Sequence, residues 1–315
     1  MRRWTLALWV VAGLLGAAAP AAGAEQRVLA TDATLLGASG PWAAAVSRTL
    51  PPIVTALHLT TGRKTVIPTP PGCTPAGLGV GQLLYSCSAD PPSISRPVLR
   101  DLATGSLQEP DGRLPELLAG HPEAIEWEGV GRHWLSAVWH SYHARVHVFV
   151  PRSGGVIRGI PFGPSPYDVR LQPDLDRPDL VRTVCAPVRQ LASGTDNPAQ
   201  TVDGFVPVAM DGSWALERPA YPWPDEASET VLQRCGSARR EVLCATACGP
   251  ALLHRGKVVW VRRDRVRVRR VTGGRTTATF GYPGDSIGAV AATGNRLFVQ
   301  LDGGRPRVVV LRLAP

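Results

Sequence analysis

Histidines cluster in one short stretch of this sequence, "HWLSAVWHSYHARVHVF", and histidine is a common metal ligand. His140 and His143 flank a Ser-Tyr pair, which predicts a two-residue turn with the two imidazoles opposite each other on adjacent strands. His147 lies four residues further along, about 13 Å away at ~3.3 Å per residue, so it cannot join the same ion. A zinc site would need a third ligand from elsewhere in the fold. We therefore expect surface histidines at a hairpin tip first, and a metal only as the alternative.

A polar segment, "SGTDNPAQ" at 193–200, carries Asp196 and Asn197, whose side-chain oxygens could bind calcium. The segment lacks the bend glycine and the terminal glutamate of an EF-hand loop, so an Asx-turn loop is the simpler interpretation. No G-x-S-x-G, H-E-x-x-H or P-loop motif occurs. We expect no cofactor. The alternative is calcium or zinc bound by His140, His143, Asp196 and Asn197.

The stretch "VVWVRRDRVRVRRV" at 258–271 alternates apolar and basic residues. If residues 263–264 form a two-residue turn, Trp260 faces Arg267 and the valines share the opposite side, as in a half-buried hairpin. The arginine stems could then cover the tryptophan while their charged ends stay in water. The hairpin fold alone is therefore enough to explain these residues. Its charge density makes an anionic glycan a candidate ligand through Arg262, Arg263 and Arg265, whereas the absence of interleaved exposed aromatics argues against nucleic acid.

The cysteines suggest disulfides. Cys73 and Cys87 flank a hairpin centred on Gly81, so their strands run side by side and a disulfide between them is expected. The other four are Cys185, Cys235, Cys244 and Cys248, for which three pairings remain open.

The first 24 residues have the pattern of a secretory signal peptide. Arg2 and Arg3 precede an apolar stretch too short to span a bilayer, and Ala22-Gly23-Ala24 resembles a cleavage site. We expect a secreted or extracytoplasmic protein whose mature part, 25–315, is a single domain without a transmembrane segment. The formal net charge of +9 comes almost entirely from arginine and is spread along the chain, so we do not take it as a nucleic-acid footprint.

Glycine turns repeat along the chain between short strands rich in valine and leucine, which indicates an all-β fold. One kind of turn follows an apolar strand and precedes a short segment closing at proline, at Gly62, Gly105, Gly154, Gly212 and Gly273. Another kind precedes a strand with an aromatic or bulky residue, at Gly40, Gly81, Gly131, Gly256 and Gly294. The pattern predicts units of four antiparallel strands, A to D, of roughly 40–60 residues. Six units fit, at about 31–71, 72–122, 123–163, 164–219, 220–283 and 284–315.

In these repeats the chain resembles the β-propeller superfamily, in particular exported bacterial propellers with six or seven blades. The last unit lacks a fourth strand, and the N-terminal "EQRVLATD" could supply it and close the ring. A β-sandwich is the alternative fold. The 220–250 insertion could add a seventh blade. No Trp-Asp dipeptides or other subfamily motifs occur, so no subfamily is implied.

The resemblance implies that the B–C and D–A loops emerge on one face, where propellers usually bind ligands. That face would collect Tyr167, Asp168, Tyr221 and Trp223 with the arginines of 262–265. We expect a non-catalytic binding or scaffolding module for a protein or glycan of the cell envelope, because no paired catalytic groups can be assembled. The alternative is a cation-dependent propeller enzyme (a hydrolase, lactonase or lyase) acting at the central channel. Neither the oligomeric state nor the ligand follows from the sequence.

Overall fold

The computed structural model describes residues 27–88, 95–110, 125–140, 145–154, 158–162, 175, 189–190, 205–211, 213–219, 229–234, 237, 239–246 and 248–313. In these residues all 25 elements are β-strands, arranged as six antiparallel sheets. The described residues include no helix that could cross a membrane.

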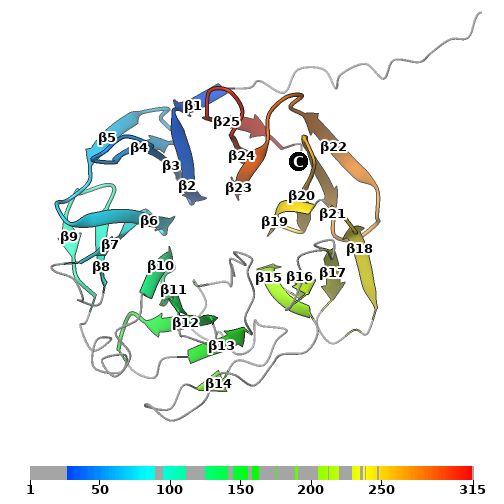
Figure 1. The fold of residues 1–315 in the computed structure, drawn as a ribbon, viewed down its shortest axis with the longest axis horizontal. Coiled ribbons are helices and arrows are strands. Elements are labelled where there is room, and N and C mark those ends of the chain that lie inside the picture. Colours follow the sequence, from blue (N-terminus) through cyan, green and yellow to red (C-terminus); the bar gives the residue numbers. More distant parts are fainter. Residues whose placement is uncertain are drawn as a thin grey trace, which may run out of the picture.

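Six sheets form the blades of a ring, numbered along the chain (Figure 1). The first blade consists of β2 (Ala33–Ser39), β3 (Trp42–Ser47), β4 (Ile53–His58) and β5 (Lys64–Pro68). The second consists of β6 (Cys73–Gly79), β7 (Gln82–Cys87), β8 (Arg96–Asp101) and β9 (Leu107–Gln108). The third has five strands, β10 (Ile125–Val130), β11 (Trp134–His140), β12 (Arg145–Pro151), β13 (Arg158–Phe162) and β14 (Arg189–Gln190).

The remaining blades follow the same order from the centre outward. The fourth consists of β15 (Phe205–Asp211), β16 (Trp214–Pro219), β17 (Thr230–Arg234) and β18 (Arg240–Cys244). The fifth consists of β19 (Cys248–His254), β20 (Lys257–Arg262), β21 (Arg265–Arg270) and β22 (Thr276–Gly281). The sixth consists of β23 (Ile287–Thr293), β24 (Arg296–Leu301), β25 (Arg307–Arg312) and β1 (Arg27–Thr31).

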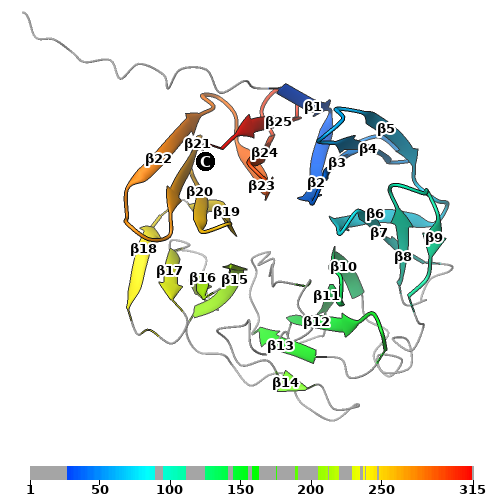
Figure 2. The same cartoon turned by 180° about the vertical axis from the view of Figure 1, so that it is seen from behind.

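The N-terminal strand closes the ring. β1 pairs antiparallel with β25, so the start of the described chain supplies the fourth strand of the sixth blade (Figures 1 and 2). This pairing covers an edge that would otherwise expose unpaired backbone groups. The predicted six-bladed β-propeller and its closure by the N-terminal strand are both confirmed.

The boundary between the fourth and fifth units was predicted wrongly. The turn at Gly212 was assigned to strands C and D, but it joins β15 to β16, strands A and B of the fourth blade. The 220–250 segment adds no seventh blade. It contains β17 and β18, the outer strands of the fourth blade, and the start of β19. A short glycine turn between apolar strands has the same sequence pattern in either position, so only the pairing of the sheets distinguishes them.

The hydrophobic core is divided among the spaces between neighbouring blades. Fourteen buried residues, among them Val259, Val268 and Val299, fill the space between the fifth and sixth blades. Trp260, Leu216 and other residues fill the space between the fourth and fifth. Similar clusters lie between the second and third, the sixth and first, and the first and second blades. The first, second, fifth and sixth blades therefore bury both of their faces, which explains why their strands are apolar on both sides.

The β20–β21 hairpin has the predicted register. Trp260 lies opposite Arg267 and Val258 opposite Arg269, with the turn at residues 263–264. The predicted half-burial is wrong, because Trp260 is only 5% exposed and Arg269 only 3%. Their face of the hairpin packs against the fourth blade instead of lying in water. The neighbouring blade causes this burial, and the sequence of the hairpin alone does not show that contact.

Candidate functional site

The predicted ligand-binding face is the one that the B–C and D–A connections define. Strands alternate in direction within each blade, so the B–C and D–A connections lie on one face and the A–B and C–D turns on the other. Tyr167 and Asp168 follow β13, and Tyr221 and Trp223 lie between β16 and β17. All four lie outside the described residues, as do Asp196 and Asn197.

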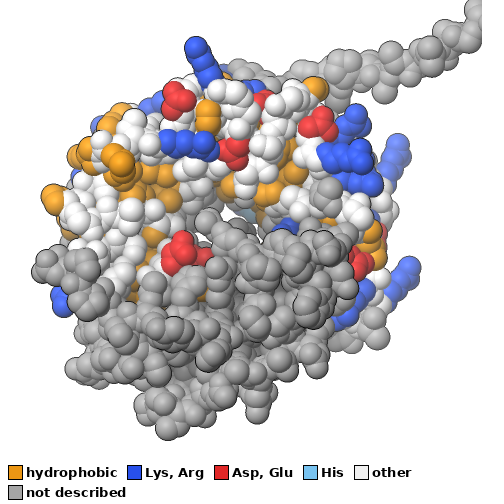
Figure 3. Space-filling model, in the orientation of Figure 1, with side chains coloured by type: hydrophobic (Ala, Val, Ile, Leu, Met, Phe, Trp, Pro, Cys, Tyr) orange, Lys and Arg blue, Asp and Glu red, His pale blue; other side chains and the backbone are white. Residues whose placement is uncertain are grey.

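The hairpin tip of the fifth blade is the described part of this face with the strongest charge. Arg262, Arg263 and Arg265 are exposed, and Lys and Arg side chains gather over this blade in Figure 3. Arg263 has a φ of 56°, which a tight two-residue turn requires. Asp264 lies 3.9 Å from Arg265, but both side chains are exposed (40% and 60%), so this pair neutralises little of the tip's charge. The Tyr282 amide donates to the Asp264 carbonyl and fixes the base of the turn.

The histidine metal site gains no support from the described residues. His140 ends β11 opposite Arg145, the first residue of β12, while His143 falls between them and outside the description. The His147 backbone lies opposite Val138, further from the tip. Among the His, Cys, Asp and Glu side chains that the structure describes, no group of three could hold a metal ion.

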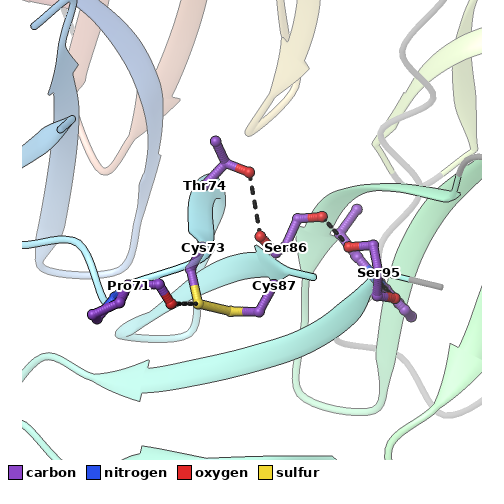
Figure 4. Close-up of a disulfide and its surroundings, with 7 residues drawn as sticks. Pro71, Cys73, Thr74, Ser86, Cys87 and Ser95 are labelled. Carbon is purple, nitrogen blue, oxygen red and sulfur yellow. Dashed lines mark hydrogen bonds between the residues drawn. A yellow bond between two sulfur atoms is a disulfide. The ribbon is translucent and has the colours of Figure 1, made fainter. Parts of the chain in front are cut away.

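Two disulfides are present in the described chain. The predicted Cys73–Cys87 bond joins β6 to β7, and near it the Thr74 hydroxyl donates to the Ser86 carbonyl at 3.2 Å (Figure 4). Cys244 bonds to Cys248 and connects the last strand of the fourth blade to the first of the fifth. This bond excludes two of the three open pairings, and Cys185 and Cys235 lie outside the described residues.

The innermost strands surround a central cavity of about 1010 Å³. All six A strands have an irregularity in their pairing with strand B, as in β2 between Leu35 and Gly37 and in β23 between Ile287 and Ala289. An extra residue at such a bulge is left outside the sheet ladder and bends the strand. The residues lining the cavity are Thr34, Leu35, Leu36, Gly37, Val46, Thr74, Pro75, Ala76, Ser86, Ile125, Glu126, Trp127, Glu128, Arg218, Cys248, Gly249, Pro250, Ala251, Gly288, Ala289, Val290, Ala291 and Gln300.

Arg218 is the one cation among the residues lining this cavity, and the sequence analysis missed it. Its Nη2 donates to the Gly249 carbonyl in a short hydrogen bond, and its Nε donates to the Thr230 hydroxyl at 3.3 Å. Burial lowers the pKa of Arg218, because removal from water disfavours the charged guanidinium. No signal in "WALERP" marks this residue, since its surroundings come from the fifth blade.

A polar network ties the first blade to the sixth on the loop face. Arg48 forms an ion pair with Asp302 at 2.5 Å, and the Gln300 amide nitrogen donates to the same carboxylate at 2.9 Å. The Gln300 amide oxygen accepts from the Leu35 backbone at 2.8 Å. The network spans more than 250 residues of sequence between Arg48 and Asp302, so no local pattern could reveal it. It reinforces the ring where the N-terminal strand closes it.

No family model matches the sequence, and no curated protein matches it. Among solved structures, the chain is similar to the β-propeller domain of the Trilobed protease from Pyrococcus furiosus, which has an open velcro topology. The TM-score is 0.55 at 11% identity, over 89% of this chain and 95% of that one. It is also similar to the Pyrococcus horikoshii acylaminoacyl peptidase, with a TM-score of 0.52 at 10% identity, over 91% of this chain and 52% of that one.

An acylaminoacyl peptidase in complex with Z-Gly-Gly-Phe-chloromethyl ketone is similar as well. Its TM-score is 0.51 at 13% identity, over 89% of this chain and 51% of that one. The chain therefore spans about half the length of the two peptidases. Identities this low show a shared propeller fold and no more.

Proposed function

We propose that this chain is an exported, non-catalytic β-propeller that binds an anionic glycan of the cell envelope through its loop face. The main support is the exposed tip formed by Arg262, Arg263 and Arg265. This tip lies on a hairpin whose two faces are both buried against neighbouring blades. A rigid base matters because the charged groups then lose little freedom when a ligand binds. Guanidinium groups suit this role, since their planar donors match carboxylate and sulfate oxygens.

The chemistry of the tip favours a polyanion over a protein with an apolar contact surface. The cores of protein–protein interfaces are depleted in charge and rich in apolar or aromatic anchors. The exposed large hydrophobic residues among those described are Val28, Leu50, Ile53, Val66, Leu107 and Val242. All of them lie outside β19–β22. The described part of the fifth blade therefore offers charge without an apolar anchor.

Export is supported by the N-terminal pattern of residues 1–24 and by the two disulfides, since disulfides form and persist mainly outside the cytosol. The propellers of similar fold include domains of peptidases. This likeness does not extend to activity, because one fold serves many functions.

The test is retention of the chain from residue 25, with its disulfides oxidised, on immobilised polygalacturonate. We expect binding that weakens with salt and falls by about tenfold or more when Arg262, Arg263 and Arg265 are all replaced by glutamate. The matched control replaces the exposed Arg63, Arg255 and Arg312 by glutamate. These three lie on the opposite face, and Arg255 shares the positive φ of Arg263 (49° against 56°). Equal losses in the two triple variants would overturn the proposed surface. Equally tight binding to polyglutamate would overturn its preference for a glycan.

A further inference from the structure

Three arginines share one side of the β20–β21 hairpin. Residues directly opposite each other in an antiparallel pair lie on the same side of the sheet, as do alternate residues along one strand. Arg262 lies opposite Arg265, and Arg267 follows two residues later on β21. Trp260, opposite Arg267, packs against the fourth blade, so all three arginines belong to the side that faces that blade. The basic surface therefore continues from the tip along the hairpin to Arg267.

These arginines have little compensating negative charge. Like charges directly opposite each other in a sheet destabilise the pairing, and Arg262 and Arg265 stand in this relation. Asp264 lies 3.9 Å from Arg265, but both side chains are well exposed. Among the described residues, neither Arg262 nor Arg267 has an ion-pair partner, and the Nε of Arg267 is buried without a hydrogen-bond acceptor. An anionic ligand would relieve this repulsion.

The outer strand of the blade leaves open space beside the arginines. Gly281 of β22 lies opposite Arg265 and Thr279 opposite Arg267, so both belong to the same side of the sheet as the arginines. Both are exposed, and a Cβ built at Gly281 would meet no atom within 4 Å. β22 is the outermost strand of its blade (Figures 1 and 2). A ligand can therefore reach this surface from the rim of the ring.

These five residues form a surface that we call the arginine strip: Arg262, Arg265, Arg267, Thr279 and Gly281. We propose that the arginine strip binds two successive acidic units of one linear glycan. The inference rests on the proposed function and names the ligand that its site takes, a chain of linked uronic acids in place of a single acidic sugar. Guanidinium groups suit both positions, because their planar donors match the two oxygens of a carboxylate.

The spacing of the strip separates two carboxylate positions. Arg262 and Arg265 hold the first carboxylate together, since directly opposed residues lie about 5 Å apart. Arg267 holds the second, about 7 Å further along the strand at ~3.3 Å per residue. The sugar chain between them lies over Gly281, and the Thr279 hydroxyl offers a hydrogen bond to a sugar hydroxyl. A second carboxylate on the same chain binds without a second loss of translational freedom.

The test is isothermal titration of the chain from residue 25 with digalacturonate, galacturonate and the uncharged galactose disaccharide. We expect digalacturonate to bind at least about tenfold more tightly than either of the others. Arg267→Gln should abolish this advantage and leave the affinity for galacturonate unchanged, because galacturonate uses Arg262 and Arg265. The matched control is Arg296→Gln, which should keep the advantage. Arg296 is also partly exposed and directly opposite another arginine, but it begins β24 on the opposite face of the ring.

A second pair of variants tests the open space and leaves every charge in place. Gly281→Leu fills the space beside Arg265 and should weaken digalacturonate binding by about tenfold or more. Gly304→Leu is its match on the loop face, because a Cβ there also meets nothing within 4 Å and neither glycine has a left-handed φ. Equal affinities of the unaltered chain for galacturonate and digalacturonate would overturn the inference. Equal losses in the two glutamine variants, or in the two leucine variants, would overturn it as well.

The outcomes separate this inference from the proposed function. Polygalacturonate retention that depends on the arginine tip, but is the same in Arg267→Gln and Gly281→Leu as in their controls, would leave the function standing and remove the second carboxylate position. Digalacturonate binding that depends on Arg267, in a chain that polygalacturonate does not retain, would keep the arginine strip and overturn binding to a polymeric glycan.

Discussion

Arg269 in the fifth blade and Glu241 in the fourth form an ion pair, with Nη2 and Oε2 2.7 Å apart. The arginine side chain is 4% exposed and the glutamate side chain 51%, so the pair links a buried cation to a carboxylate at the surface. The Nε of the same arginine is also buried, without a hydrogen-bond partner among the described residues. The interface between these blades therefore depends on Glu241 for compensation of a buried charge.

Removing Glu241 should destabilise the protein more than its exposure suggests. Glu241→Gln leaves the Arg269 charge buried and uncompensated, which we expect to cost about 1–3 kcal/mol in free energy of unfolding. Urea denaturation measures this cost, with the exposed Glu109→Gln as the control, expected within about 0.5 kcal/mol of the parent. Equal stabilities of the two variants would show that the pair contributes nothing.

Glu217 should give the stability a pH dependence. Burial raises the pKa of this carboxyl above its usual value, and the nearby Arg240, 3.3 Å away, offsets the effect only in part. An acid with a raised folded pKa contributes stability below its unfolded pKa of about 4.3, and this contribution is lost as the pH rises through the folded value. Glu217→Gln should therefore match the parent near pH 4 and exceed its stability at pH 7. Denaturant unfolding at both pH values measures the difference in free energy of unfolding between the variant and the parent. The same difference at pH 4 and pH 7 would contradict this account.

The Tyr282 hydroxyl should be dispensable. It is buried and makes no hydrogen bond to a described residue, and burial raises the pKa of Tyr282 to about 12. Removing an unsatisfied hydroxyl leaves no orphaned partner, so Tyr282→Phe should change the free energy of unfolding by less than about 0.5 kcal/mol or increase it. Thermal unfolding and the absorbance of tyrosinate at high pH would measure both effects. A clear loss of stability in the phenylalanine variant would mean that the hydroxyl has a partner.

The two disulfides should differ in what they contribute. The Cys73–Cys87 bond closes a loop of sequence separation 14 and the Cys244–Cys248 bond one of only 4. The chain-entropy model then predicts losses of about 3 and about 2 kcal/mol when each pair is replaced by serines. Unfolding of the two double variants under identical oxidising conditions gives the comparison. The reverse order would indicate that the Cys244–Cys248 bond acts mainly by joining the two blades.

Deletion of β1 should open the ring. A chain beginning at Asp32 leaves the edge of β25 unpaired, and in the intact protein Val308 and Val309 of that strand are fully buried. We expect a lower Tm and self-association through the exposed edge, measured by thermal unfolding and light scattering. A chain beginning at Arg27 keeps β1 and serves as the control. An unchanged, monomeric deletion variant would show that β1 is not needed for closure.

Local patterns were sufficient for much of this fold. The alternation of valine and arginine at 258–270 predicted the register of β20 and β21, because paired strands place every second residue on one side. The spacing of Cys73 and Cys87 around Gly81 predicted their disulfide for the same reason. The missing fourth strand of the last repeat predicted the role of β1, since a propeller blade with an open edge is unfavourable.

Only the tertiary structure decided which surfaces the blades bury and which charges they bring together. Trp260 and Arg269 are buried because the fourth blade covers them, a contact absent from the hairpin's own sequence. Arg218 meets Gly249 across two blades, and Arg48 meets Asp302 across the closure of the ring. Short-range periodicity determines most strands and hairpins, although it did not show which two strands of its blade the Gly212 turn joins. The polar environment of the cavity depends on packing between blades, which no single repeat encodes.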